Sequence, residues 1–120
     1  MSIECIDAGL RVGSKPLLDG IAPRLPHGRV CAILGANGAG KSSLLSLLCG
    51  QRPPTQGRVL LDDRDIAAHS PAALALRRAV MPQESSVAFD FNAEEIVALG
   101  RLPHRLAPEA DERSIVPAAM

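Results

Sequence analysis

GANGAGKS, residues 35–42, is the stretch that decides the fold of this 120-residue chain. It fits the pattern G-x-x-x-x-G-K-[S/T] of a phosphate-binding loop. A triphosphate needs many N–H donors that converge on it, so the backbone must curl around the anion. Residues without a β-carbon allow that curl and the close approach. The candidate nucleotide-binding residues are Gly35, Ala36, Asn37, Gly38, Ala39, Gly40, Lys41, Ser42 and Ser43.

Lys41, Ser42 and Ser43 carry the chemistry expected at the end of this loop. Lys41 is predicted to reach the β- and γ-phosphates of ATP, and the Ser42 hydroxyl to ligate Mg²⁺. The backbone N–H of Ser43 is placed for the α-phosphate. A helix that begins at Lys41 adds its positive dipole end. The alternative is a glycine-rich turn that only caps a helix.

The segments on either side of the loop predict an α/β fold. The run RVCAILG at residues 29–35 is apolar throughout, which is typical of a strand buried on both faces of a parallel sheet. KSSLLSLLCG, residues 41–50, predicts a helix that Gly50 closes. A strand, a glycine-rich loop and a helix in this order are the context that the motif requires.

Further strands are predicted at residues 3–12, 17–25, 58–63 and 79–83. Turn-rich GSKP joins the first two, and polar DDRD follows the third. Asp62 imitates the aspartate that ends an apolar strand and binds magnesium in such enzymes. We do not assign it to magnesium, because it lies too soon after Ser42 for a helix, a crossover and another strand to intervene. A hairpin turn is the expected role of this aspartate.

Three more helices are predicted in the second half of the chain. Ser70 and Pro71 resemble an N-cap and a first helical residue before residues 71–78. Asn92 caps the next helix with Glu95 in the capping-box position, and Gly100 ends it. A last helix begins near residue 108, and we expect Pro117 to interrupt it.

Composition excludes several classes of function. Thirteen basic and thirteen acidic residues cancel, which argues against nucleic acid as a partner. Cys5, Cys31 and Cys49 form no CxxC pair and lie in apolar segments, so we expect buried thiols and no zinc site or disulfide framework. No apolar run approaches the roughly 20 residues that span a bilayer, and the N-terminal segment does not have the pattern of a signal peptide.

With these motifs in place, the chain resembles the ATP-binding subunits of ABC transporters. The matching segments are LLDGIAPRLPHGRVCAILGANGAGKSSLLSLLCG, PPTQGRVLLDDRDI and RRAVMPQ. The resemblance implies an α/β P-loop NTPase core with an N-terminal antiparallel β subdomain. It implies one partial nucleotide-binding domain over residues 1–120, with the phosphate loop at 35–43, a glutamine loop around Gln83 and the start of a helical subdomain at 92–120.

The resemblance assigns residue roles beyond the loop. It gives Gln83 a contact with Mg²⁺ or the attacking water, so Lys41 and Gln83 are the implied catalytic residues. Many members of the family place an aromatic side chain near the position of Val12 to stack on adenine. The aliphatic Val12 implies that recognition of the base is weaker here or supplied differently.

A finer likeness, in MPQESSVAFDFNAEEIVALGRLPH, is to the importers of haem, iron-siderophores and cobalamin, and SSVAF and GRLPH are most similar to haem (haemin) importers. In this family the cargo does not visit the ATPase subunit, so His27, His69 and His104 are interpreted as surface histidines. The resemblance implies transmembrane permease subunits, a second ATPase subunit bound head-to-tail and, indirectly, a periplasmic binding protein. It places the subunit at the cytoplasmic face of the inner membrane, attached through the permease.

The chain lacks the LSGGQ motif and the strand-end Asp-Glu pair of the family. We therefore expect the front half of an ATPase subunit, truncated before the helical subdomain is complete, that does not hydrolyse ATP alone. Two alternatives stay open. The chain is a non-catalytic nucleotide-binding module that occupies the permease, or it is a different small P-loop enzyme such as a kinase.

Overall fold

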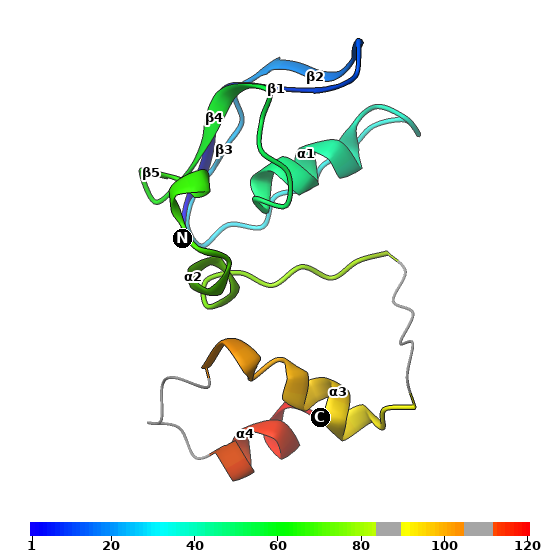
Figure 1. Ribbon diagram of the computed structural model, residues 1–120, viewed down its shortest axis with the longest axis vertical. Helices are drawn as coiled ribbons and strands as arrows, with labels where there is room; N and C mark the ends of the chain where they lie inside the picture. The colour runs from blue at the N-terminus through cyan, green and yellow to red at the C-terminus, as the bar shows by residue number, and fades with distance from the viewer. Residues whose placement is uncertain (84–89, 105–111) are drawn as a thin grey trace. The chain divides into compact units, whose positions relative to one another are not determined.

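The computed structural model describes residues 1–83, 90–104 and 112–120. The chain divides into two compact units, Met1–Ser70 and Pro71–Met120. The first unit contains β1 (Ile3–Val12), β2 (Lys15–Ile21), β3 (Arg24–Leu25), α1 (Lys41–Leu48), β4 (Gln56–Leu61), β5 (Arg64–Asp65) and the 3₁₀ helix η1 (Ile66–Ala68). The second contains α2 (Pro71–Ala75), α3 (Ala93–Leu99), the 3₁₀ helix η2 (Leu102–His104) and α4 (Glu112–Ala119). Figure 1 labels the strands and the α-helices among these elements.

An antiparallel sheet forms the frame of the first unit. Its strand order is β2-β1-β4-β5, and β3 also pairs with β1. The strands predicted at residues 3–12 and 17–25 are confirmed as the antiparallel pair β1 and β2, although the second strand divides into β2 and β3 around Pro23. Proline has no N–H to donate to a strand ladder, which explains the break.

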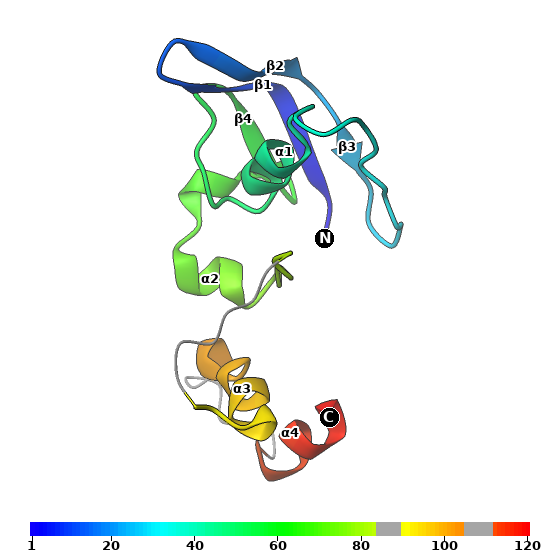
Figure 2. The same ribbon diagram turned by 90° about the vertical axis from the view of Figure 1, so that its right-hand side faces the viewer.

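Helix α1 covers one face of this sheet (Figure 2). Leu47 and Leu48 are buried, together with Cys5 and Leu10 of β1 and Val59 of β4. A buried leucine side chain contributes about 1.5–3 kcal/mol to stability. This small aliphatic core attaches the C-terminal half of α1 to the sheet, and it therefore orients the loop that precedes α1.

Gly50 ends α1 as the sequence predicts. Its φ is +66°, its N–H donates to the Leu47 carbonyl, and the Gln51 N–H donates to the Ser46 carbonyl, 2.9 Å in both cases. These two bonds make a Schellman motif, in which a left-handed residue satisfies the last helical carbonyls.

The turn after β4 confirms the predicted hairpin. Asp62 and Asp63 both have positive φ, +48° and +62°, and Leu61 pairs with Arg64 across them. This is the geometry of a two-residue turn between antiparallel strands, and aspartate tolerates it better than most residues do.

A bulge in β1 shapes the middle of the sheet. The register between β1 and β4 shifts between Ile6 and Gly9, and Asp7 has a positive φ of +47°. Gly57 of β4 faces this bulge: a β-carbon there would lie 2.1 Å from the Asp7 carbonyl oxygen. The Gln56 side chain donates to Asp7 Oδ2 at 2.9 Å. The bulge therefore depends on a residue without a side chain at position 57.

Two predicted strands are wrong. Residues 29–35 form no strand, and Leu34 is 88% exposed. Residues 79–83 also lie outside any strand. A parallel strand is held by hydrogen bonds to neighbouring strands, and all strand pairs in the described ranges are antiparallel pairs of β1 or β4. The apolar composition was right for such a strand, but the described part of the chain offers it no partner.

The cysteine prediction is wrong for one residue. Cys5 is buried, Cys49 is half-buried, and Cys31 is exposed in the segment that does not form a strand. Burial raises the pKa of the Cys5 thiol.

The second unit confirms one helix in detail and corrects two others. The Asn92 side chain accepts the Glu95 N–H at 2.9 Å, and the Glu95 carboxylate accepts the Asn92 N–H at 2.8 Å, so the capping box of α3 is complete. Helix α2 begins at Pro71 as expected but ends at Ala75, before the predicted residue 78. Pro117 lies inside α4 and does not interrupt it. The helix loses one backbone hydrogen bond there and ends within two residues, at Ala119.

The described residues contain no helix that is long and apolar enough to cross a membrane.

Thiol labelling tests the correction at residues 29–35. We expect iodoacetamide to alkylate Cys31 at least about tenfold faster than Cys5 at pH 8, because the reactive thiolate of Cys5 is both buried and formed only at higher pH. Mass spectrometry of peptides from a time course measures both rates, and the urea-unfolded chain serves as the control in which the difference disappears. Equal protection of Cys31 and Cys5 would show that residues 29–35 are buried after all.

Two glycine substitutions test the bulge. Gly57 and Gly13 have similar φ, +66° and +59°, but a β-carbon on Gly13 meets nothing within 4 Å. We expect Gly13→Ala to cost about 1–2 kcal/mol of unfolding free energy, from left-handed strain alone. Gly57→Ala adds a clash with backbone and is expected to cost about 1–3 kcal/mol more. Urea unfolding measures both, and equal costs would contradict the close contact.

Candidate functional site

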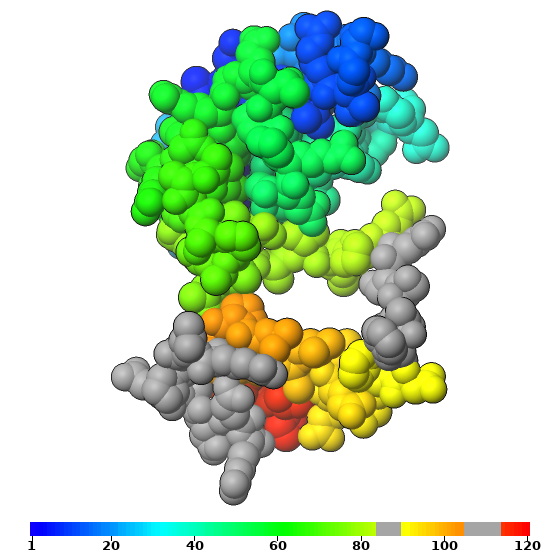
Figure 3. Space-filling model, viewed as in Figure 1, coloured from blue at the N-terminus to red at the C-terminus, as the bar shows by residue number. Residues whose placement is uncertain are grey.

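Residues 35–39 of the phosphate loop are exposed, and with the half-buried Gly40 they form a turn that leads directly into α1. It lies at the surface of the first unit, in cyan to teal in Figure 3. Gly38 and Gly40 have φ of +81° and +92°, the left-handed region that favours glycine. The Ala39 N–H donates to the Ala36 carbonyl at 3.2 Å and closes the turn. The glycines that the sequence singled out therefore occupy positions where the backbone turns.

Gly40 has a second constraint, which comes from the sheet. A β-carbon at this position would lie 3.0 Å from the Leu17 carbonyl oxygen and 3.0 Å from Leu18 Cδ2. Both atoms belong to β2. The start of α1 is thus packed closely against the antiparallel sheet, and this contact was not predicted from the sequence. A glycine required by spacing alone gives no information about which strand approaches it.

The first turn of α1 presents unused donors. The helical ladder begins with the Leu44 N–H donating to the Gly40 carbonyl at 2.8 Å. Gly40 supplies no side-chain cap, and the first turn contains no acidic residue. The N–H groups of Lys41, Ser42 and Ser43 therefore have no intrahelical acceptor. Together with the positive end of the helix dipole, they suit an anion.

Lys41 lies over its own loop. Its Nζ donates to the carbonyl oxygens of Gly35 at 2.7 Å and Ala36 at 2.6 Å. These bonds hold the ammonium group beside the turn and the start of the helix. One positive charge, several backbone N–H donors and the exposed Ser42 hydroxyl are brought together within residues 35–43, as the sequence predicts.

A pocket of about 210 Å³ lies along α1 beside this loop. Its lining is polar, with three serines, an amide and a guanidinium group: Ser42, Ser43, Ser46, Gln51 and Arg52. The Schellman motif at Gly50 and the bond from the Arg52 N–H to the Ser46 carbonyl, 3.2 Å, position the last two residues. Sequence reasoning missed Arg52, because nothing in QRPPTQG indicates that the chain folds back along the helix.

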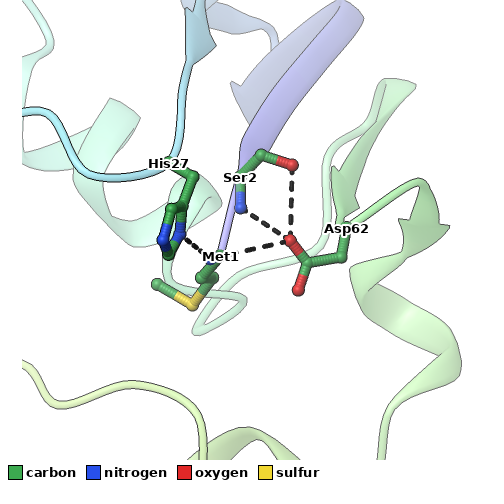
Figure 4. Close-up of polar contacts among 4 residues, drawn as sticks. All are labelled: Met1, Ser2, His27 and Asp62. Carbon is green, nitrogen blue, oxygen red and sulfur yellow. Dashed lines mark hydrogen bonds and ion pairs between the residues drawn. The ribbon is translucent and has the colours of Figure 1, made fainter.

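Asp62 has structural partners. Its Oδ1 accepts the Ser2 N–H at 2.6 Å and the Ser2 hydroxyl at 3.3 Å, and the terminal ammonium group of Met1 lies 4.0 Å away (Figure 4). The Met1 amine also contacts His27 Nδ1. Asp62 thus ties the β4–β5 turn to the start of β1, which agrees with leaving it out of the candidate magnesium ligands.

The other predicted groups lie outside the first unit or outside the described residues. Gln83 is exposed and belongs to the second unit, so its relation to Ser42 stays a prediction. The stretch SSVAF, residues 85–89, lies outside the described residues. Within the ranges that the structure describes, no group of three His, Cys, Asp or Glu side chains is arranged to hold a metal ion.

The profile of the ABC transporter family matches residues 18–116 of this chain. The match begins within β2, includes the loop and α1, and continues into the second unit. The chain belongs to the ABC transporter family. Its α/β fold with an antiparallel β subdomain is the fold of ABC ATPases, in agreement with the sequence-based expectation.

Relatives within the ABC family are similar over most of this chain. The hemin import ATP-binding protein HmuV of Pseudomonas fluorescens is 52% identical over 92% of this chain and 43% of its own length. The protein of the same name from Pseudomonas aeruginosa is 44% identical, over 91% of this chain and 43% of its own length. The chain therefore spans less than half the length of these relatives.

Solved structures of ABC proteins are also similar to this chain. A bacterial Atm1-family ABC exporter with ATP bound has a TM-score of 0.75 and 31% identity, over 83% of this chain and 18% of the exporter chain. The ADP conformation of MJ1267, an ATP-binding cassette of an ABC transporter, has a TM-score of 0.58 and 31% identity, over 64% of this chain and 31% of its own.

Proposed function

We propose that this chain binds ATP at residues 35–43 and that it is part of the ATPase subunit of an ABC importer. The observation that carries the proposal is the start of α1, where open N–H groups, Lys41 Nζ and a left-handed glycine turn converge. The α-, β- and γ-phosphates supply the acceptors that these donors lack. Lys41 exchanges its bonds with the Gly35 and Ala36 carbonyls for bonds to the β- and γ-phosphates.

Mg²⁺ fits the site through Ser42, whose exposed hydroxyl lies in the first turn of α1. When bound, the ion neutralises charge on the β- and γ-phosphates. We propose that Gln83 also contacts the ion or the attacking water. Because of this proposed contact, Lys41 and Gln83 are together assigned as catalytic residues. Residues 1–120 then form a partial nucleotide-binding domain, with 92–120 as the start of its helical subdomain.

Haemin is the proposed cargo of the importer. The relatives from two Pseudomonas species are both called hemin import ATP-binding proteins, and their identity of 44–52% over most of this chain supports haemin over siderophores or cobalamin. The cargo itself is not expected to touch this subunit.

The proposed partners are transmembrane permease subunits, a second ATPase subunit and, indirectly, a periplasmic binding protein. The subunit would lie at the cytoplasmic face of the inner membrane. Ile96 and Leu99 of α3 are 41% and 45% exposed, so α3 and the Gln83 loop are our candidates for the surface that contacts the permease. Cross-links from permease loops to other surfaces of a full assembly would contradict this assignment.

Substitution of Lys41 tests nucleotide binding, and the chain offers a matched control. Lys15 is the other lysine in the sequence, and it is exposed at the start of β2. We expect Lys41→Ala to weaken binding of ATP with Mg²⁺ about 10- to 100-fold, the value of hydrogen bonds to a charged group, and Lys15→Ala to leave binding unchanged. Isothermal titration calorimetry measures both affinities, and equal effects of the two substitutions would contradict the assignment.

Turnover is expected to be absent from the 120-residue chain, because it contains no LSGGQ motif and no strand-end glutamate to orient water. Phosphate release from ATP and Mg²⁺ measures this. Steady hydrolysis by the isolated chain that Lys41→Ala abolishes would show that the chain is catalytically complete.

A further inference from the structure

The side chain of Leu18, in β2, packs against the start of α1. A β-carbon on Gly40 would lie 3.0 Å from Leu18 Cδ2 and 3.9 Å from Leu18 Cγ, so the isobutyl group faces the point where the phosphate loop becomes a helix. Leu18 is half-buried, and it pairs with Leu10 of β1, which is buried in the core of the first unit. An aliphatic side chain therefore connects that core to the start of α1.

Gly40 is the residue through which a displacement would reach the phosphate-binding groups. Its carbonyl accepts the Leu44 N–H at 2.8 Å, and it directly precedes residues 41–43, whose N–H groups have no intrahelical acceptor. A glycine has no side chain with which to pack, so its position depends on what its neighbours pack against it. Removal of the Leu18 isobutyl group would leave a void beside Gly40, and the loop and the first turn of α1 would relax toward that void.

Leu17 also approaches Gly40, but with its backbone. Its carbonyl oxygen would lie 3.0 Å from a β-carbon on Gly40. Successive side chains of a strand point to opposite faces of the sheet, so Leu17 and Leu18 do not share a face. The approach of the Leu17 carbonyl does not depend on which side chain stands at that position, whereas the contact made by Leu18 does. The amino-acid sequence of β2 thus acts on the loop through Leu18.

We propose that Leu18 is a positioning residue for phosphate binding. Its side chain holds Gly40, and through Gly40 it holds the N–H donors of residues 41–43 where they receive a triphosphate. This inference rests on the proposed function, since it concerns how residues 35–43 are held. Leu18 acts through the loop and not by contact with the nucleotide, so its effect is the same for ATP and for tripolyphosphate, which has neither base nor ribose.

Calorimetric titration of the 120-residue chain with ATP and with tripolyphosphate, each with Mg²⁺, tests the proposal. We expect Leu18→Ala to weaken the binding of both ligands about tenfold, a loss that is common when a residue that supports a binding group is removed. Leu18→Met conserves the volume of the side chain, and it is expected to keep both affinities within about twofold of those of the unaltered chain.

Leu60→Ala is the matched control. Leu60 is another half-buried leucine of a strand, and its partners across the sheet are Glu4 and Asp65, which lie outside the loop. We expect this variant to lower the urea midpoint as Leu18→Ala does, because both lose a half-buried isobutyl group, but to leave both affinities unchanged. If Leu18→Ala does not fold, Leu18→Val is titrated in its place, with an expected loss of about threefold for both ligands.

The outcomes separate this inference from the proposed function. Equal losses of affinity in the Leu18 and Leu60 variants would mean general destabilisation and overturn the positioning role. A loss for ATP alone would mean that Leu18 touches the nucleoside, and unchanged binding of both ligands would mean that the loop does not depend on it. Each of these results overturns the inference and leaves residues 35–43 as the binding site. If the unaltered chain binds neither ATP nor tripolyphosphate, the proposed function itself fails.

Discussion

The contact between Gly40 and β2 is the constraint on which the site depends. A β-carbon on Gly40 would lie 3.0 Å from both the Leu17 carbonyl and Leu18 Cδ2, and the residue has a φ of +92°. Space and backbone conformation thus both require glycine. Leu47 and Leu48 fix the other end of α1 in the core, so the helix is held at both ends by the antiparallel sheet. The open N–H groups of Lys41, Ser42 and Ser43 lie at the start of this helix, so the packing of the helix on the sheet sets their direction.

The sequence predicted those elements whose signals are local. The Schellman motif at Gly50, the capping box of Asn92 and Glu95, and the turn at Asp62 and Asp63 each depend on a few neighbouring residues, and all three are present. Residues 29–35 and 79–83 were predicted as strands from their apolar composition, and they are not strands. Composition shows that a segment favours burial, but a strand also needs a neighbour, and the neighbour is supplied by residues far away in the sequence. The error at Pro117 has the opposite origin. The local rule that proline interrupts a helix predicted a break there, but α4 continues through Pro117 to Ala119.

At the candidate site, too, the sequence predicted the local features but not the contacts between distant segments. The spacing of GANGAGKS predicts a phosphate-binding loop at residues 35–43, because its glycines, Lys41 and Ser42 are the residues that such a loop requires. The packing of Leu17 and Leu18 against Gly40, and the placement of Gln51 and Arg52 along α1, could not be predicted, because these contacts depend on how the chain returns from other elements. The resemblance to the family assigned Gln83, yet this residue lies in the second unit, and geometry adds nothing to that assignment.

The groups that we propose for nucleotide binding occupy a small part of the chain. These groups, namely the loop, the first turn of α1 and Lys41, are attached to an antiparallel sheet that contains no strand at residues 29–35. Phosphoryl transfer to water needs further groups that orient the nucleophile and surround the γ-phosphate. The chain spans about 43% of the length of its Pseudomonas relatives, and Gln83 is the residue that we propose for such a role. The proposed phosphate site therefore rests on a local glycine contact and a small aliphatic core, and hydrolysis would need more groups than the described residues of the first unit bring together.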